Sequence, residues 1–316
     1  MTLSVDNSSA EDSIDIAICT FRRPHIADTL RSIARMRIPS PWRIRIIVAD
    51  NDEVTSAQSL VENTAAALNL PVTYVHAPAR NISIARNACL DASAAPLLAF
   101  VDDDEIVSAE WLEQMLATWQ TTKANIVLGP VEAIYEAHHP RWMRQGDFHA
   151  TRPVWVEGCI QTGYSCNVLM ERDVFAQSGL RFRKDLGKSG GEDTMFFAQA
   201  FDNGATIAFA EQAIITEAVP QSRASLMWLL KRRYRSGQTH GRLLIEKNPQ
   251  TLGLIKKIKI ILIAVIKWAY SYAMAVFTVF NGVKSRYWLL RGTLHLGVVA
   301  SIMGASEIEQ YGVSDV

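Results

Sequence analysis

Short apolar runs alternate with longer amphipathic segments through the first half of the chain. The apolar runs have the length and β-branched content of strands, and each is followed by a stretch with helical periodicity. The predicted strands span residues 14–20, 44–50, 72–76 and 97–101. The predicted helices span residues 25–37, 55–68, 82–92 and 108–119. This alternation predicts an α/β fold in which a mostly parallel sheet is covered by helices on both faces.

The middle of the chain is less regular. Strand-like pieces at 125–128 and 206–209 lie on either side of a Gly-rich turn at 187–191, which leads into a helix-like segment at 194–201. After Pro220 the composition becomes basic and apolar, beginning with residues 223–235. We therefore expect a flexible N-terminus at 1–12, an α/β domain at 13–222 and a C-terminal helical region at 223–316.

The C-terminal region contains two apolar segments. Residues 258–280 are long enough for a bilayer-spanning helix, which needs about 20 apolar residues. Lys267 lies near the middle of this segment, and basic residues flank both of its ends, so neither orientation is favoured. Residues 287–304 are interrupted by Arg291 and His295. These charges favour a peripheral or monotopic helical hairpin on a membrane surface over a true span, with a helical subdomain packed on the sheet as the alternative.

The overall composition argues against some partners and compartments. The 32 basic and 32 acidic side chains balance, so nothing indicates a nucleic-acid-binding surface. The four cysteines lack metal-site spacing and are interpreted as reduced packing residues. The N-terminus has neither a basic nor an apolar signal region, so we expect the α/β domain to stay in the cytoplasm.

A strand-like apolar run ends abruptly in four acids, Asp102, Asp103, Asp104 and Glu105. Open α/β sheets bind ligands at the carboxyl ends of their strands. In an extended chain Asp102 and Asp104 point the same way and Asp103 the opposite way. Adjacent carboxylates repel one another, so we expect a hard divalent cation, Mn2+ or Mg2+, shared with substrate phosphates. A solvated acidic turn is the alternative.

A second acidic pair follows the Gly-rich turn. Asp193 comes after two glycines and precedes the helix-like segment, so its carboxylate can project into a cleft and accept a proton as a general base. Glu192 is expected to tune Asp193 or to position a substrate. Capping of the helix by either acid is the alternative, and it is compatible with catalysis. His240 is a further, isolated candidate metal ligand.

Five segments resemble, in order, the motifs of the inverting family 2 glycosyltransferases with the GT-A (Rossmann-like) fold. The resemblance covers about residues 12–245 and rests on the segments 16–23, 48–52, 81–90, 98–105 and 190–197. It implies that Asp50 binds uracil, Asp102 the ribose and Asp104 the metal, and that Asp193 is the base. The predicted donor-nucleotide residues are Thr20, Arg22, Asp50, Arg86, Asp102 and Asp103.

Residues 141–149, 187–194 and 231–244 are similar to the glucosyltransferases of bacterial succinoglycan synthesis. This narrower similarity implies transfer of glucose from UDP-glucose, in a β-1,4 link, to a polyprenyl-diphosphate-linked oligosaccharide. It also implies work at the cytoplasmic face of the inner membrane, with an exopolysaccharide synthesis complex as a possible partner. The chain lacks the Gln-x-x-Arg-Trp signature of processive family members, which favours addition of one sugar per acceptor.

Two other functions fit the same residues. A nucleotidyltransferase also uses paired acids and a divalent metal, but it releases pyrophosphate instead of UDP. A non-catalytic subunit could bind a sugar nucleotide and act as a scaffold in a polysaccharide synthesis complex. The presence of Asp102, Asp104 and Asp193 together favours the enzyme.

Overall fold

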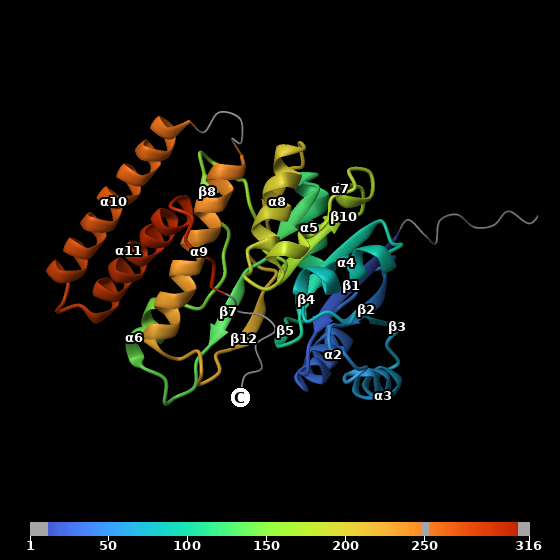
Figure 1. Cartoon of the computed structure of the whole chain (residues 1–316). Coiled ribbons are helices and arrows are strands. Elements are labelled where there is room, and N and C mark those ends of the chain that lie inside the picture. Colours follow the sequence, from blue (N-terminus) through green and yellow to red (C-terminus); the bar gives the residue numbers. More distant parts are fainter. Residues whose placement is uncertain (1–11, 248–252, 309–316) are drawn as a thin grey trace, which may run out of the picture.

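A seven-stranded sheet forms the centre of the protein, for which a computed structural model describes residues 12–247 and 253–308 (Figure 1). Its strand order is β11-β6-β10-β4-β1-β2-β3. The strands are β1 (Ser13–Thr20), β2 (Arg43–Asp50), β3 (Val72–His76), β4 (Leu97–Asp102), β6 (Ile126–Leu128), β10 (Asn167–Glu171) and β11 (Ile207–Phe209). The six strands predicted from the sequence all belong to this sheet, with ends that differ by at most one residue.

The sheet is mostly parallel, as predicted, with one exception. Strands β4, β1, β2 and β3 run parallel to one another, and β6 pairs in parallel with β11. Strand β10 lies antiparallel between β4 and β6 and was not predicted. Both partners of β10 are distant in sequence, so no local pattern indicates this pairing.

Helices cover both faces of the sheet because successive side chains of a strand point to opposite faces. On β1, Ile14, Ile16 and Ile18 pack against helices α2 (Ile26–Arg35), α3 (Gln58–Leu68) and α5 (Trp111–Thr122). Ala17 and Cys19 pack on the other face against α4 (Ile82–Ala92) and α8 (Glu192–Asp202). The predicted helix at 82–92 is confirmed, and the other predicted helices differ from the structure by a few residues at their ends.

Smaller elements surround the carboxyl edge of the sheet. A three-stranded sheet has the order β5 (Glu105–Val107), β12 (Ile215–Ala218), β7 (Val131–Ile134). Because β5 follows β4 almost directly, the acidic turn joins the two sheets. The remaining short elements are α6 (Arg141–Gly146), β8 (Trp155–Val156), β9 (Cys159–Ile160), α7 (Asp173–Ala176) and the 3-10 helix η1 (Lys184–Leu186).

Three long helices form the C-terminal region: α9 (Leu226–Glu246), α10 (Leu254–Phe277) and α11 (Gly282–Ile302). Helix α11 packs between α9 and α10 (Figure 1). The two predicted apolar segments lie in α10 and α11, and among the described residues only α10 is long and apolar enough to cross a membrane. Only 11% of the most apolar 18-residue stretch of α10 is buried in the protein. The predicted flexible N-terminus lies outside the described residues, except for its last residue.

Candidate active site

The predicted functional residues gather at one edge of the central sheet. The register of β1 pairs Thr20 with Asp50 on β2, and Cys19 with Asp102 on β4. Because these strands are parallel neighbours, their carboxyl ends meet at the same edge. The loops that follow them carry Arg22 and the triple-aspartate turn.

The three aspartates of the turn differ in their hydrogen-bond partners and in their exposure. Asp103 accepts hydrogen bonds from Thr20 Oγ1 at 2.7 Å and from Arg23 Nη1 at 3.1 Å. Arg23 Nη1 also donates to Asp104 Oδ2 at 2.5 Å. The side chains of Asp102 and Asp104 are 41% and 23% exposed, against 7% for Asp103. Asp102 and Asp104 are therefore the two acids of the turn that a substrate or cation can reach.

Arg86 lies between this turn and the Gly-Gly-Glu-Asp segment (residues 190–193) and interacts with both. It lies on α4, whose first turn is capped by Asn81 through hydrogen bonds from Ser83 N and Ile84 N. Its guanidinium donates a hydrogen bond to Glu192 and stands 3.9 Å from Asp102 Oδ1. The side chains of Arg86 and Glu192 are 6% and 3% exposed, so this is a buried ion pair. The two acidic segments, 90 residues apart along the chain, thus meet at a single arginine.

Asp193 is half-buried in the first turn of α8. Gly191, with φ of 88°, holds the N-cap position, so neither acid is the N-cap residue. A Cβ on Gly191 would come within 2.6 Å of the Thr239 side chain, so α9 closes tightly on this turn. Asp193 Oδ1 accepts the N–H of Thr194 at 2.6 Å, and Oδ2 makes no hydrogen bond within the part of the chain that the structure describes. Oδ2 is therefore the oxygen of Asp193 that its neighbours leave open.

Burial raises the pKa of several carboxyls in the acidic run. It raises the pKa of Asp103 to about 7, against the charge of Arg23, and raises that of Glu105 well above its usual range. Burial also raises the pKa of Asp102; Arg86 opposes this rise, and the charge of Asp104 adds to it. Burial and mutual repulsion therefore outweigh the nearby arginines at these carboxyls.

The accessible acids fit a divalent cation of the Mn2+ or Mg2+ type. Asp102 and Asp104 offer carboxylate oxygens, the ligands that these ions prefer. Within the described ranges there is no group of three His, Cys, Asp or Glu side chains that could hold a metal alone. This agrees with the usual behaviour of Mg2+ in phosphate sites, where one or two carboxylates and the substrate phosphates share the ion.

Several predicted donor-binding residues have partners inside the protein. Asp50 is fully buried, and its oxygens accept hydrogen bonds from Asp52 N, Ala57 N and Tyr74 Oη. Thr20 is 2% exposed and donates to Asp103. The oxygens of Asp50 hold the loop after β2 and the start of α3, and the contact between Asp50 and uracil stays a prediction.

Arg22 and His240 also have charged neighbours within the protein. Arg22 has left-handed backbone (φ 55°) and pairs with Asp52 at 2.8 Å, which lowers the pKa of Asp52 to about 2. His240 lies on α9, and its charged neighbours are Lys267 and His295 on α10 and α11. Burial and Lys267 lower its pKa. The structure thus places Lys267 and His295 of the helical hairpin near His240, whose role as a metal ligand stays a prediction.

Two arginines and a glutamate at the site were not predicted. Arg23 contacts both Asp103 and Asp104, and its position beside Arg22 in the loop after β1 was the only signal. Arg223 pairs with Glu217 at 2.5 Å and stands 3.8 Å from Asp104. No local pattern indicates this contact, because residues 217–223 reach the site through the pairing of β12 with β5.

Comparisons with known proteins agree with this geometry. The model of the family described as glycosyl transferase family 2 matches residues 15–179. The succinoglycan biosynthesis protein ExoM of Rhizobium meliloti is 52% identical over 303 residues, which cover 96% of this chain and 97% of that protein. The glucosyl-dolichyl phosphate glucuronosyltransferase of Haloferax volcanii is 20% identical over 245 residues, covering 71% of this chain and 75% of that protein.

Solved structures show the same fold at low sequence identity. The mannosyltransferase PcManGT from Pyrobaculum calidifontis, in complex with GDP-Man and Mn2+, matches with a TM-score of 0.60 and 16% identity over 92% of this chain and 86% of that one. TarS 1-349 of S. aureus in complex with UDP-GlcNAc matches with a TM-score of 0.52 and 13% identity over 95% and 98%. The chain therefore belongs to glycosyl transferase family 2 and is a glycosyltransferase with the GT-A fold.

Proposed function

We propose that the enzyme transfers glucose from UDP-glucose, with inversion, to a polyprenyl-diphosphate-linked oligosaccharide during synthesis of a succinoglycan-type exopolysaccharide. The 52% identity to the succinoglycan biosynthesis protein ExoM supports the pathway. A β-1,4 link follows the narrower sequence similarity described above. The observation that carries the catalytic part is the contact of Arg86 with both Glu192 and Asp102, because it brings a candidate base and the acidic turn into one site.

In the proposed reaction Asp193 accepts the proton of an acceptor hydroxyl. The oxygen of that hydroxyl attacks the anomeric carbon on the face opposite the diphosphate. The new carbon–oxygen bond forms as the bond from the anomeric carbon to the phosphate oxygen breaks, so configuration inverts and UDP leaves. The ion pair between Arg86 and Glu192 fixes the first turn of α8, which holds Asp193 in place.

Asp102 and Asp104 are the residues that would hold Mn2+ or Mg2+ together with the donor phosphates. The bound ion would supply positive charge to the leaving diphosphate. PcManGT, which has the same fold, is known in complex with Mn2+ and a sugar nucleotide, and this supports the assignment. Thr20, Arg22, Asp50 and Asp103 would shape the donor pocket through the hydrogen bonds described above.

We further propose that the outer face of α10 lies in the cytoplasmic surface of the inner membrane. This face carries exposed apolar side chains, among them Ile255 (83%) and Phe277 (81%). Lys256, Lys257 and Lys259 stand at its start, where anionic headgroups would attract them. A complete span is disfavoured because α11 returns from α10 and packs on α9 beside the catalytic sheet. A lipid-linked acceptor would share this surface.

The test is an incubation of the full-length enzyme in membranes with Mn2+ or Mg2+, a panel of UDP-, GDP- and dTDP-sugars, and a lipid extract containing the oligosaccharide acceptors. Analysis of the products should find UDP and a lipid-linked oligosaccharide longer by one β-linked glucose. Release of pyrophosphate would instead assign a nucleotidyltransferase. Binding of a sugar nucleotide without any transfer would favour the scaffold function.

A further inference from the structure

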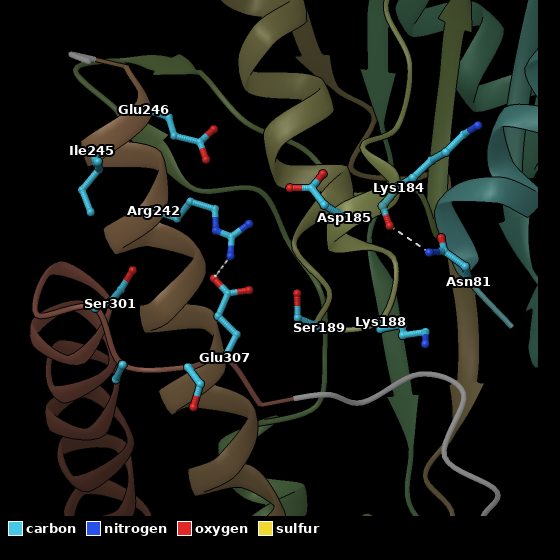
Figure 2. Close-up of a pocket in the computed structure, with 13 residues that line it drawn as sticks. Asn81, Lys184, Asp185, Lys188, Ser189, Arg242, Ile245, Glu246, Ser301 and Glu307 are labelled. Carbon is cyan, nitrogen blue, oxygen red and sulfur yellow. Dashed lines mark hydrogen bonds and ion pairs between the residues drawn. The ribbon is translucent and has the colours of Figure 1, made fainter. Parts of the chain in front are cut away.

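A cavity of about 680 Å3 lies beside the candidate active site (Figure 2). Its walls are the Gly-rich turn, the C-terminal half of α9 and the tail that follows α11. Asn81, the residue that caps the helix carrying Arg86, also lines this cavity. The cavity and the candidate site therefore share a wall.

The tail places a carboxylate on an arginine of this cavity. Glu307 lies beyond the end of α11, and its Oε1 is 2.5 Å from Arg242 Nη2. The two side chains point toward each other in Figure 2. Their exposed fractions are 25% for Arg242 and 16% for Glu307, so the pair is partly buried. Arg242 follows Thr239 by one turn of α9, and Thr239 contacts Gly191 beside the candidate base.

Two other carboxylates, Asp185 and Glu246, line the cavity, and the charge of Arg242 also acts on Asp185. Asp185 and Glu246 both pair with Arg183. Within the described part of the chain, Arg242 has Glu307 as its ion-pair partner and Lys188 has none. Withdrawal of Glu307 would leave the Arg242 guanidinium and the Lys188 amine unpaired in the same cavity, together with the Ser189 hydroxyl.

These donors suit a phosphate-bearing ligand. A guanidinium can donate two parallel hydrogen bonds to a phosphate, and its charge here already holds the carboxylate of Glu307. A lysine amine adds a mobile point charge, and a serine hydroxyl adds a further donor. We propose that this cavity binds the diphosphate group of the lipid-linked acceptor, and that Glu307 occupies Arg242 until the diphosphate replaces it. This inference rests on the proposed use of diphosphate substrates.

The test measures binding of inorganic diphosphate to the full-length protein by titration calorimetry. Glu307→Gln removes the competing carboxylate and should tighten binding about fivefold, whereas Arg242→Gln should weaken it about tenfold. Arg242→Lys keeps the charge but not the paired hydrogen bonds, so its loss should be smaller. Lys247→Gln is the matched control, because Lys247 is a cation of the same region that pairs with Asp202. It should bind as the wild type does.

The double variant Arg242→Gln, Glu307→Gln is decisive, because the gain from Glu307→Gln should vanish once Arg242 is absent. Equal binding by the wild type, Glu307→Gln and Arg242→Gln, with all three folded by circular dichroism, overturns the inference. So does a gain that persists in the double variant. These measurements do not involve transfer, so an inactive enzyme that shows the expected binding would contradict the proposed function and leave the site in place.

Competition assigns the source of the diphosphate. Vesicles that contain a polyprenyl diphosphate should displace inorganic diphosphate, and matched vesicles that contain only phosphatidylglycerol should not. UDP should displace it poorly, because the proposed function places the donor phosphates at Asp102 and Asp104. Failure of the polyprenyl diphosphate to compete, or stronger competition by UDP, overturns the assignment to the acceptor.

Discussion

Arg86 is the residue on which the site depends most. It is nearly buried, it donates to Glu192, and it stands close to Asp102. A buried guanidinium is stable only beside carboxylates, so each of the two acidic segments holds the other in place through this residue. The same arrangement leaves Asp193, next to Glu192, in the first turn of a helix that cannot shift freely.

Replacing Asp193 tests its role as the base. Asp193→Asn keeps the size of the side chain but removes its ability to take a proton. We expect transfer to fall by about 10²–10⁴ while UDP-glucose binding stays near normal. The control is Asp202→Asn, at the other end of α8, where the carboxylate pairs with an exposed lysine. Near-normal turnover in Asp193→Asn would remove this residue from its role.

Replacing Glu192 tests the buried ion pair. Glu192→Gln leaves the Arg86 charge with Asp102 as its nearest carboxylate, and we expect a loss of about 3 kcal/mol in the free energy of unfolding. The exposed pair of Arg37 with Glu110 is a matched control, and Glu110→Gln should cost less than about 0.5 kcal/mol. Urea unfolding measures both. Equal costs for the two variants would show that the buried pair does not stabilise the site.

The His149 ring makes the stability of the protein depend on pH. Its Nε2 donates to the Arg223 carbonyl at 3.1 Å, and its Nδ1 lies 3.0 Å from Tyr135 Oη. Burial and the nearby Arg232 charge lower its pKa from 6.5 to about 4. The unfolded chain therefore binds a proton at a higher pH than the folded one, and this contribution to stability is lost as pH falls from 6.5 to 4.

The expected measurement is a difference between two proteins. The free energy of unfolding of the wild type minus that of His149→Gln should be constant above pH 6.5 and should fall by up to about 3 kcal/mol toward pH 4. Comparing the two proteins removes the opposing effect of buried carboxyls that both contain. A difference that does not change with pH would mean that His149 titrates normally in the folded protein.

The residues also show what sequence patterns can and cannot predict at a site. The positions of Asp102 and Asp50 at strand ends follow from local patterns. Their surroundings do not follow from local patterns. The carboxylate of Asp50 accepts hydrogen bonds from Tyr74 on β3 and from the backbone at the start of α3. Such contacts depend on which strands become neighbours, and one sequence carries no periodic signal for that.

At the scale of elements, the central strands were predictable as short apolar runs, because helices cover both faces of the sheet, and the helices as amphipathic segments. The short strands β5, β7, β10 and β12 were not predicted, and each pairs only with strands that are distant in sequence, which a local pattern does not reveal. Arg223 and Glu217 reach the site through these short strands. The same limit therefore explains both the missed elements and the missed site residues.

Close packing of α9 on α11 depends on glycines. A Cβ on Gly237 would lie 2.0 Å from the Leu294 carbonyl oxygen, and one on Gly297 would lie 2.0 Å from that of Tyr234. Gly237→Ala should therefore push the helices apart and cost about 1–3 kcal/mol of stability. Gly253→Ala is the control, because a Cβ there meets nothing within 4 Å. A thermal unfolding temperature for Gly237→Ala equal to that of the control would contradict the packing.

At the scale of the whole molecule, packing within one copy of the chain does not explain why the exposed side of α10 is apolar. Its apolar side chains are covered by nothing within the described residues, and a soluble protein rarely exposes such a patch without a partner. Helix α11 lies between α9 and α10 and packs on both, so it joins the apolar face to the rest of the protein. Under the proposed function, this face and the lipid of the acceptor would share one surface.

Membrane attachment can be tested without disturbing that packing. Ile255, Ile258, Leu262 and Ile266 are all more than half exposed and follow one side of α10. Changing all four to Gln should lower sedimentation with anionic vesicles by at least about 100-fold, because each buried aliphatic side chain contributes about 1.5–3 kcal/mol to partitioning. The pair Val54→Gln, Leu60→Gln removes exposed apolar side chains from the catalytic domain and should change nothing.

Deletion of residues from Leu254 onward should also release the protein from membranes. Because the deletion removes α11 and Glu307 as well, it is a less specific test of attachment through α10. High salt should partly weaken the binding of the wild type to vesicles, because it screens Lys256, Lys257 and Lys259. The contribution of the apolar side chains to binding should remain. Unchanged sedimentation of the four-residue variant would mean that α10 belongs to an ordinary packed subdomain. The acceptor would then have to reach the active site from the membrane by another route.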